Sequence, residues 1–342
     1  MSDQFTIKNH YNPCFWTACW NYNYYQALLN GNSKDYKARE QEVHILNLKT
    51  GKILKNKVEN IHFDKKLGVA EITPETLSDF YRRNYPLEYV KLRESLKQNT
   101  ESVYFDFEDI LTGMENSKGY DALMEIVVSN SIKDVHQKGF LTCQIILQAM
   151  RSHEMMNSMI KTMNSIGMPK WEYLWILKNA WSNVYILYRA TRALAFSQWI
   201  LYVIDKHMFP LCDSPVMINE NTLMMTISPR LLLEINLNQK CDENDWIIRR
   251  GISKSKYWGF RRRSIQNSFK DIIFHDPKEL ENWRNTREFK IRSEHLRDRN
   301  NKDVLIADAA KRVIGAINGF GKIPDDFELR LKEEMESIEK TN

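Results

Sequence analysis

The stretch from Phe209 to Leu237 constrains the fold more than any other part of the chain. Its sequence, FPLCDSPVMINENTLMMTISPRLLLEINL, contains three short apolar runs separated by turn residues. Short apolar runs bounded by Pro, Asn, Asp and Ser are typical of buried β-strands. The stretch therefore predicts a small sheet, with the polar set Asp213-Ser214-Pro215 between two of its strands. The helices before it and a basic segment after it would pack around that sheet.

The composition is that of a folded protein with room for one large domain or two modest ones. The 342 residues are 43% hydrophobic and 27% charged, which excludes a mainly disordered chain. The net charge of +5 is only a weak indication of an anionic partner.

The cysteines and the N-terminus indicate the cellular compartment. The five cysteines include no CxxC pair, so neither a disulfide framework nor a structural zinc site is indicated. The first residues lack the apolar core of a secretory signal, and no apolar run reaches the roughly 20 residues that span a bilayer. We therefore expect a cytoplasmic protein that does not associate with membranes.

The pattern along the chain predicts an α+β protein. Alternating runs at 43–48 and 52–58, joined by Lys49-Thr50-Gly51, indicate a β-hairpin, and residues 62–72 are compatible with another strand. Helical spacing starts at Thr73-Pro74, which suits a helix N-terminus. Helices are predicted near 75–99, 104–114, 119–137, 139–164 and 170–197. Strands are predicted at 199–204, 208–211, 223–227 and 231–237, followed by a basic helical stretch after Asn244.

This order of elements predicts one main domain over residues 1–275. It would contain an N-terminal β-hairpin region, a large helical middle and a late, small, mainly antiparallel sheet. Residues 276–342 would form a charged helical C-terminal extension packed on that domain.

Two short polar segments are candidates for a site. His10 lies in the aromatic segment KNHYNPCFWTACW, and its unperturbed pKa of about 6.5 would let it act as acid or base at neutral pH. Asp213 would emerge at a strand end, where ligand groups are often placed. Tyr11 and Ser214 are candidate substrate contacts beside them. His10 and Asp213 also have a structural interpretation. His10 would be a hydrogen-bonding histidine of the fold, and the Asp213 side chain would accept hydrogen bonds from backbone N–H groups in a turn.

The helix predicted near 139–164 carries a polar line. Gln144, Gln148 and Arg151 fall at i, i+4 and i+7 on a face flanked by apolar residues. If that line faces a pocket, Gln148 would contact the substrate and Arg151 would bind a carboxylate or phosphate. A buried ion pair between Arg151 and Asp213 would explain the same residues without catalysis.

A basic segment follows the predicted sheet. Between positions 249 and 263 there are seven basic residues and no acidic one, with Tyr257, Trp258 and Phe260 between them. Cations interleaved with aromatic rings suit phosphate contact and base stacking. An amphipathic helix with its aromatic residues inward explains the same sequence. The seven basic residues are Arg249, Arg250, Lys254, Lys256, Arg261, Arg262 and Arg263.

Four landmarks occur together in order along the chain. They are the segment NHYNP, the hairpin ILNLKTGK, the helix with Gln148 and Arg151, and LCDSPV followed by TISPRLLLEI. Over residues 8–260 this set resembles a bacterial family of unknown function, whose members begin with an HYVP-type motif and carry an SDNP-type motif late in the chain. This sequence has Asn12 where the family generally has Val, and Cys212 where it has Ser. The resemblance implies a shared fold and pocket, and no activity.

These observations lead to two functional hypotheses. The first is an enzyme that acts on a phosphate-containing substrate, a nuclease-like phosphodiester hydrolase. His10 would be its acid or base, Arg151 would hold the anion, and Asp213 would orient His10 or hold a divalent metal. The alternative is a non-catalytic module that binds nucleic acid or protein, in which these polar residues form a buried structural network. Dinucleotide, P-loop and α/β-hydrolase motifs are absent from the sequence.

Overall fold

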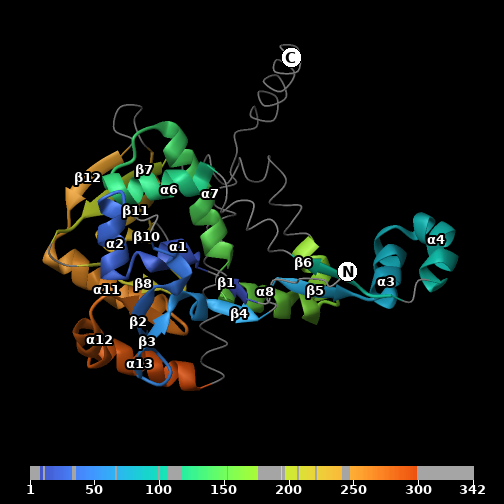
Figure 1. Cartoon of the computed structure of the whole chain (residues 1–342). Coiled ribbons are helices and arrows are strands. Elements are labelled where there is room, and N and C mark those ends of the chain that lie inside the picture. Colours follow the sequence, from blue (N-terminus) through green and yellow to red (C-terminus); the bar gives the residue numbers. More distant parts are fainter. Residues whose placement is uncertain are drawn as a thin grey trace, which may run out of the picture.

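The computed structural model of the chain describes residues 8–10, 12–32, 36–65, 68–98, 101–106, 118–151, 153–175, 194, 197–205, 208–219, 222–240 and 247–298. Within these residues the protein has a main body built on two sheets and an arm that extends from it (Figure 1). Helices and separate, mostly antiparallel sheets confirm the predicted α+β class.

The larger sheet has five strands in the order β12-β7-β11-β10-β9. All its neighbouring strands are antiparallel except β12 and β7, which are parallel. This is the late, mainly antiparallel sheet that the stretch 209–237 predicts. Its strands are β7 (Ser197–Val203), β9 (Val216–Ile218), β10 (Thr222–Ser228), β11 (Leu231–Lys240) and β12 (Ile247–Gly251).

Both faces of the five-stranded sheet are covered. On one face Trp199, Leu201 and Leu233 belong to the main hydrophobic cluster of the body. On the other face Ile200 and Leu232 share a cluster with residues of the following helix, α11 (Lys254–Asn267). Strands that are buried on both faces lose the apolar and polar alternation of a half-exposed strand, which explains the continuous apolar runs of the sequence.

Several described helices contribute residues to the main cluster. They are α1 (Cys14–Ala18), α2 (Tyr22–Leu29), α6 (Lys118–Ser129) and α7 (Val135–Arg151). The indole N–H of Trp16 donates to the Ile227 carbonyl oxygen at 2.8 Å, and that of Trp20 donates to Phe209 at 2.8 Å. The N-terminal aromatic segment is therefore fixed directly to the late sheet.

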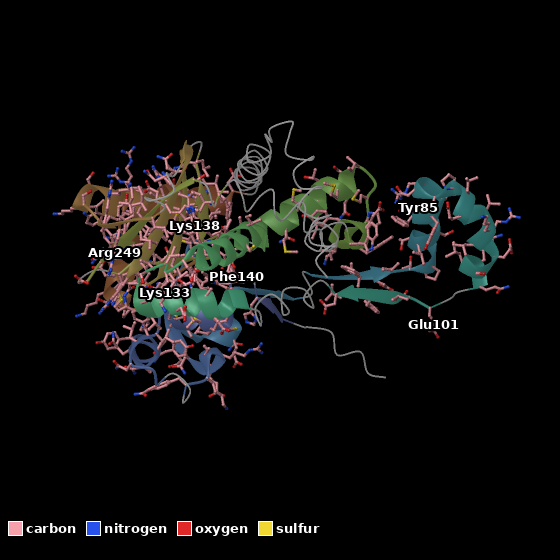
Figure 2. All side chains as sticks on the ribbon, turned by 90° about the horizontal axis from the view of Figure 1, so that it is seen from above. Tyr85, Glu101, Lys133, Lys138, Phe140 and Arg249 are labelled. Carbon is pink, nitrogen blue, oxygen red and sulfur yellow. The ribbon has the colours of Figure 1, made fainter. Side chains whose placement is uncertain are left out.

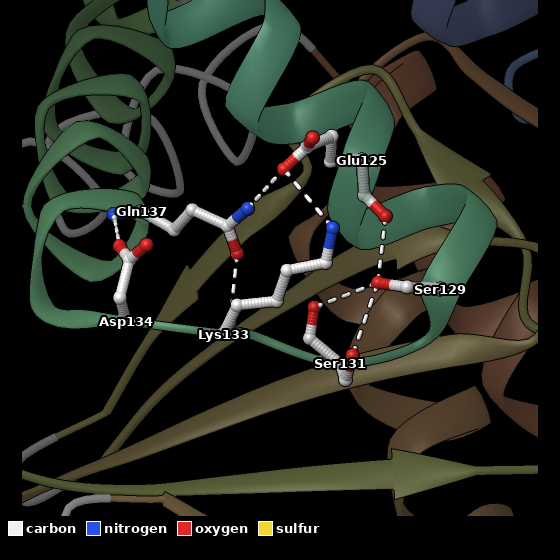
Figure 3. Close-up of polar contacts among 6 residues, drawn as sticks. All are labelled: Glu125, Ser129, Ser131, Lys133, Asp134 and Gln137. Atoms are coloured by element: carbon white, nitrogen blue, oxygen red, sulfur yellow. Dashed lines mark hydrogen bonds and ion pairs between the residues drawn. The ribbon is translucent and has the colours of Figure 1, made fainter.

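Polar contacts hold the turn between α6 and α7 (Figure 3). The Glu125 carboxylate accepts a hydrogen bond from the Gln137 side-chain amide and lies 3.5 Å from the Lys133 ammonium. The Gln137 side-chain oxygen accepts from the backbone N–H of Lys133 at 2.8 Å. Asn130, which begins the turn, has a φ of 49°, a left-handed value that Asn tolerates better than most residues. The result is a helical hairpin with a fixed geometry, and α7 leads from it toward the candidate site.

The second sheet has four strands in the order β3-β2-β13-β8. The predicted hairpin is confirmed as β2 (Glu42–Asn47) and β3 (Ile53–Lys57), and Gly51 turns the chain with a φ of 69°. The other strands are β8 (Leu211–Cys212) and β13 (Asp271–Phe274). The N-terminal hairpin thus shares a sheet with part of the stretch 209–237.

Two C-terminal helices cover this second sheet. In α12 (Pro277–Arg284) and α13 (Arg287–Arg297), Trp283 and Phe289 share a buried cluster with Leu46 of the hairpin. Residues 277–297 are therefore packed on the preceding part of the chain. The boundary at 276 stays a prediction, and residues 299–342 lie outside the described residues.

The arm has its own small core of aromatic and methionine side chains, among them Phe80, Trp171, Met156 and Met163. It begins beyond the pair β1 (Lys8–His10) and β4 (Phe63–Lys65), which lies between body and arm (Figure 1). In Figure 2, Tyr85 lies toward the end of the arm, whereas Arg249 lies on the body. The arm is built from β5 (Val69–Ile72), β6 (Val103–Asp106), α3 (Pro74–Asn84), α4 (Pro86–Gln98), α8 (His153–Ser165) and a helical segment at 170–175.

Some sequence predictions are wrong in their bounds or type. The helix predicted near 104–114 begins instead as β6, which pairs with β5, and residues 107–117 lie outside the described residues. The helix predicted at 75–99 is broken at Tyr85, because Pro86 disfavours a helical conformation in the residue before it. The helices predicted at 119–137 and 139–164 divide instead at Asn130 and at position 152.

The basic stretch after Asn244 is not helical throughout. Arg249 and Arg250 lie on β12, and only the later basic residues lie on α11. The run 208–211 forms a strand only at its last residue, in β8. The part of the predicted helix 170–197 that spans 176–193 lies outside the described residues. No helix in the described ranges is long and apolar enough to cross a membrane.

Candidate functional site

The N-terminal segment enters the body as a strand. In the pair β1 and β4, His10 lies opposite Phe63. The His10 imidazole is partly buried, and its Nε2 lies 3.2 Å from the carbonyl oxygen of Glu59. Tyr11, the neighbouring candidate contact, lies outside the described residues.

Two residues further on, the Asn12 side chain connects four distant segments. Its Nδ2 donates to His62 Nδ1 at 2.8 Å and to the Cys212 carbonyl oxygen at 3.0 Å. Its Oδ1 accepts a hydrogen bond from Gln148 Nε2 at 2.6 Å. All three side chains are buried. We call this group, with the Cys212 carbonyl, the Asn12 junction.

The Asn12 junction brings together separate parts of the chain. The start of the chain, α7 and the Cys212-Asp213 segment meet there. Gln148, predicted to contact a substrate, donates its side-chain amide to Asn12.

His62 is a buried residue of this group that the sequence analysis missed. Burial, followed by the nearby charges of Lys270 and His10, lowers the pKa of His62 to about 3. The ring is therefore neutral at physiological pH, and acceptance of a hydrogen bond at Nδ1 places the proton on Nε2. His62 has a φ of 51°, a left-handed value in which His is enriched several-fold. No motif marks it, because its role depends on a partner 50 positions away.

The carboxylate of Asp213 holds backbone amides of the turn after α11. Its two oxygens accept from the N–H of Phe269, each at 3.1 Å, and one of them accepts from the N–H of Lys270 at 2.7 Å. The carboxylate is buried, so these hydrogen bonds compensate part of its desolvation. Hydrogen bonding of Asp213 to the backbone of a turn is the structural alternative named for this residue from the sequence. The turn that it holds lies 56 residues further along the chain. Ser214, the next residue, is half-buried.

The remaining candidate groups are Arg151, the Cys212 thiol and any set of metal ligands. The backbone of Arg151 ends α7, and its side chain lies outside the described part of the structure. Burial raises the pKa of the Cys212 thiol to about 12, so this thiol stays protonated at neutral pH. Within the described residues, no group of three or more His, Cys, Asp and Glu is arranged to hold a metal ion.

The basic segment forms a second candidate, at the surface. Along α11, the exposed positions recur every four residues and include Lys254, Trp258 and Arg262. Arg249 and Arg250 are exposed at the end of β12, just before this helix. We call these five residues the α11 surface. Arg249 is labelled on the body in Figure 2.

The cations of the segment differ in how far they are already engaged. Lys256 pairs with Glu234 at 2.8 Å, Arg261 with Glu279 at 3.7 Å and Arg262 with Glu288 at 3.0 Å. Arg263, half-buried, directs one N–H at the Met224 sulfur. Among the residues that the structure describes, none forms an ion pair with the remaining three, Arg249, Arg250 and Lys254.

The fold and these two groups define an α+β protein with a buried polar junction and a basic, aromatic surface. Comparison of the chain with protein-family models, with curated proteins and with solved structures gave no match.

Proposed function

We propose that this protein binds nucleic acid through the α11 surface. The observation that carries the proposal is the set of exposed cations Arg249, Arg250 and Lys254, which form no ion pair among the described residues. Phosphate contacts by such cations supply most of the affinity in sequence-independent binding to nucleic acid. No acidic residue lies between 249 and 263, so no carboxylate of the segment itself offsets these three charges.

The contacts of Asp213, a predicted catalytic residue, and of Gln148, a predicted substrate contact, favour this binding function over catalysis. The Asp213 carboxylate is occupied by backbone amides, and Gln148 is occupied by Asn12. Both sets of hydrogen bonds stabilise the fold without a substrate. The turn that Asp213 holds directly follows α11.

A second candidate, phosphodiester hydrolysis, is favoured by one observation. The Asn12 junction gathers the segments of His10, Arg151 and Asp213, and the His10 ring is only partly buried. In this proposal His10 is the acid or base, Arg151 holds the phosphate, and Asp213 orients His10 or holds a divalent metal. Phosphodiester cleavage that is lost in His10→Gln, with the free energy of unfolding unchanged, supports this candidate.

Charge removal tests the binding function. We expect the triple variant Arg249→Ala, Arg250→Ala, Lys254→Ala to bind a labelled oligonucleotide more weakly in fluorescence anisotropy titrations at several salt concentrations. Each lost phosphate contact lowers the slope of log K against log salt by about 0.7 on a single strand and about 0.9 on a duplex. The triple variant should therefore have a slope smaller by about 2 to 3.

The arm supplies a matched control for this test. Lys91→Ala, Arg93→Ala, Lys97→Ala removes three exposed cations from α4, so both triple variants change the net charge from +5 to +2. The control should bind like the unaltered chain. Equal losses in the two variants would show only a general charge effect, and an unaltered chain that does not bind would refute the proposal.

A further inference from the structure

The indole of Trp258 does not belong to the hydrophobic clusters that α11 helps to form among the described residues. It is 44% exposed, and no other large apolar side chain is exposed on α11. The buried face of this helix is formed by other residues, among them Phe260 and Ile265. An exposed indole forgoes much of the favourable free energy that burial would give.

The exposed ring is nevertheless held in a defined position. The guanidinium carbon of Arg261 lies 4.5 Å from the centre of the Trp258 ring and 4.3 Å from that of Trp283, so Arg261 is packed between the two indoles. Arg261 is buried and also lies 3.7 Å from Glu279. Trp283 is fully buried in the second core. One face of the Trp258 ring is thus supported by the body. The ring is already ordered before a ligand binds, so binding does not include the entropic cost of ordering it.

Cations flank this ring along the helix. Lys254 lies one turn before Trp258 and Arg262 one turn after it, all on the exposed stripe of α11. A protein partner that buried the indole would also have to desolvate these charges, and no second large apolar side chain is exposed on α11 to offset that cost. A nucleotide, which has an apolar base face beside a phosphate, matches both the ring and the cations.

We infer that Trp258 is a stacking platform for an unpaired base and that the α11 surface therefore selects single-stranded over double-stranded nucleic acid. This inference rests on the proposed function and specifies its ligand. In a duplex the faces of the bases are stacked on each other, so only the phosphates are available to the surface. In a single strand one base can lie on the indole while Lys254 and Arg250 contact the adjacent phosphates.

The test compares Trp258→Ala and Trp258→Phe with the unaltered chain. Anisotropy titrations use a labelled 20-nucleotide single strand, as DNA and as RNA of the same sequence, and the corresponding duplex. We expect Trp258→Ala to weaken single-strand binding by about 5- to 150-fold, the range that the loss of one stacked base gives, with duplex binding unchanged. Trp258→Phe, which keeps an aromatic face, should retain more of the binding. Trp175→Ala, which removes a 40% exposed indole from the arm, is the matched control and should have no effect.

The outcomes separate the inference from the proposed function. Equal affinity for single strand and duplex, or normal single-strand binding by Trp258→Ala, overturns the inference. In either case the proposed function stands if the triple variant at Arg249, Arg250 and Lys254 still loses binding. If the unaltered chain binds none of the oligonucleotides, both fall. Thermal melting of Trp258→Ala and Trp258→Phe establishes that each is folded at the assay temperature. Different affinities for DNA and RNA identify which of the two is the preferred strand.

Discussion

At the scale of single residues, Asn12 joins distant parts of the chain. Both donor hydrogens and the oxygen of its amide have buried partners, on His62, Cys212 and Gln148. Loss of the amide would leave these groups without their hydrogen bonds to Asn12, which would lower the free energy of unfolding by about 1–3 kcal/mol for each group. The residue is therefore explained by the stability of the fold, and a ligand is not needed to account for its position.

The buried histidine of the Asn12 junction makes a prediction about pH. The pKa of His62 is about 3 in the folded protein, and about 6.5 is expected in the unfolded chain. The folded pKa is the lower one, so the stabilising contribution of neutral His62 is complete above pH 6.5 and is lost progressively between about pH 6.5 and 3. In that range the free energy of unfolding should fall by about 1.4 kcal/mol per pH unit on account of this group.

Urea unfolding at a series of pH values checks this expectation. His62→Asn removes the titrating group and keeps a residue that tolerates the left-handed backbone at this position. The difference in pH dependence between the two proteins isolates His62 from the carboxylates. Parallel curves between pH 6.5 and 4 would mean that His62 becomes protonated in the folded state as readily as in the unfolded one.

At the scale of elements, local patterns identified those structures that local interactions fix. Gly51 has the positive φ that closes the hairpin of β2 and β3, and the Thr73 hydroxyl accepts from the N–H of Thr76 at 3.2 Å at the start of α3. Arg249 and the start of the predicted helix 104–114 were assigned wrongly. Arg249 lies in β12, which pairs with β7, and residue 104 lies in β6, which pairs with β5. These partner strands are distant along the chain or are not marked by the local apolar spacing. Tertiary pairing overrides a weak local preference in such segments.

Asp213 connects two elements, and this gives a second prediction. Asp213→Asn keeps one acceptor oxygen and loses the charge that strengthens the hydrogen bonds to Phe269 and Lys270. We expect the free energy of unfolding to fall by about 1–3 kcal/mol in urea titrations. Hydrogen exchange of the Phe269 and Lys270 amides should accelerate more than that of amides in β10, the matched reference. Unchanged stability together with loss of a phosphodiesterase activity would instead assign Asp213 to catalysis.

At the scale of the whole molecule, the body and the arm differ in how they are stabilised. The body buries two sheets beneath helices, whereas α4 on the arm has no buried residue at all. Leu87 on this helix is 74% exposed. Segments with few buried apolar contacts unfold locally at a lower free energy than the core.

Limited trypsin digestion tests this difference. Among the described residues, we expect the first cleavages at Lys91, Arg93 and Lys97 of α4, identified by mass spectrometry, because opening this helix breaks few contacts. Arg261 and Arg292, which are buried in the body, should be cleaved much later. Cleavage of α11 or α13 before α4 would show that the body opens more readily than the arm.

The amino-acid sequence by itself determined the α+β class, the late sheet and the first hairpin, because these follow from apolar periodicity and turn residues within short windows. It also located the basic segment with Trp258 and the two segments that meet at Cys212. Only the tertiary structure decided what the polar groups contact, since the partners of Asn12 and Asp213 lie 50 to 200 positions away. A side chain's chemical role depends on the groups around it in space, and folding brings those groups together from separate parts of the chain.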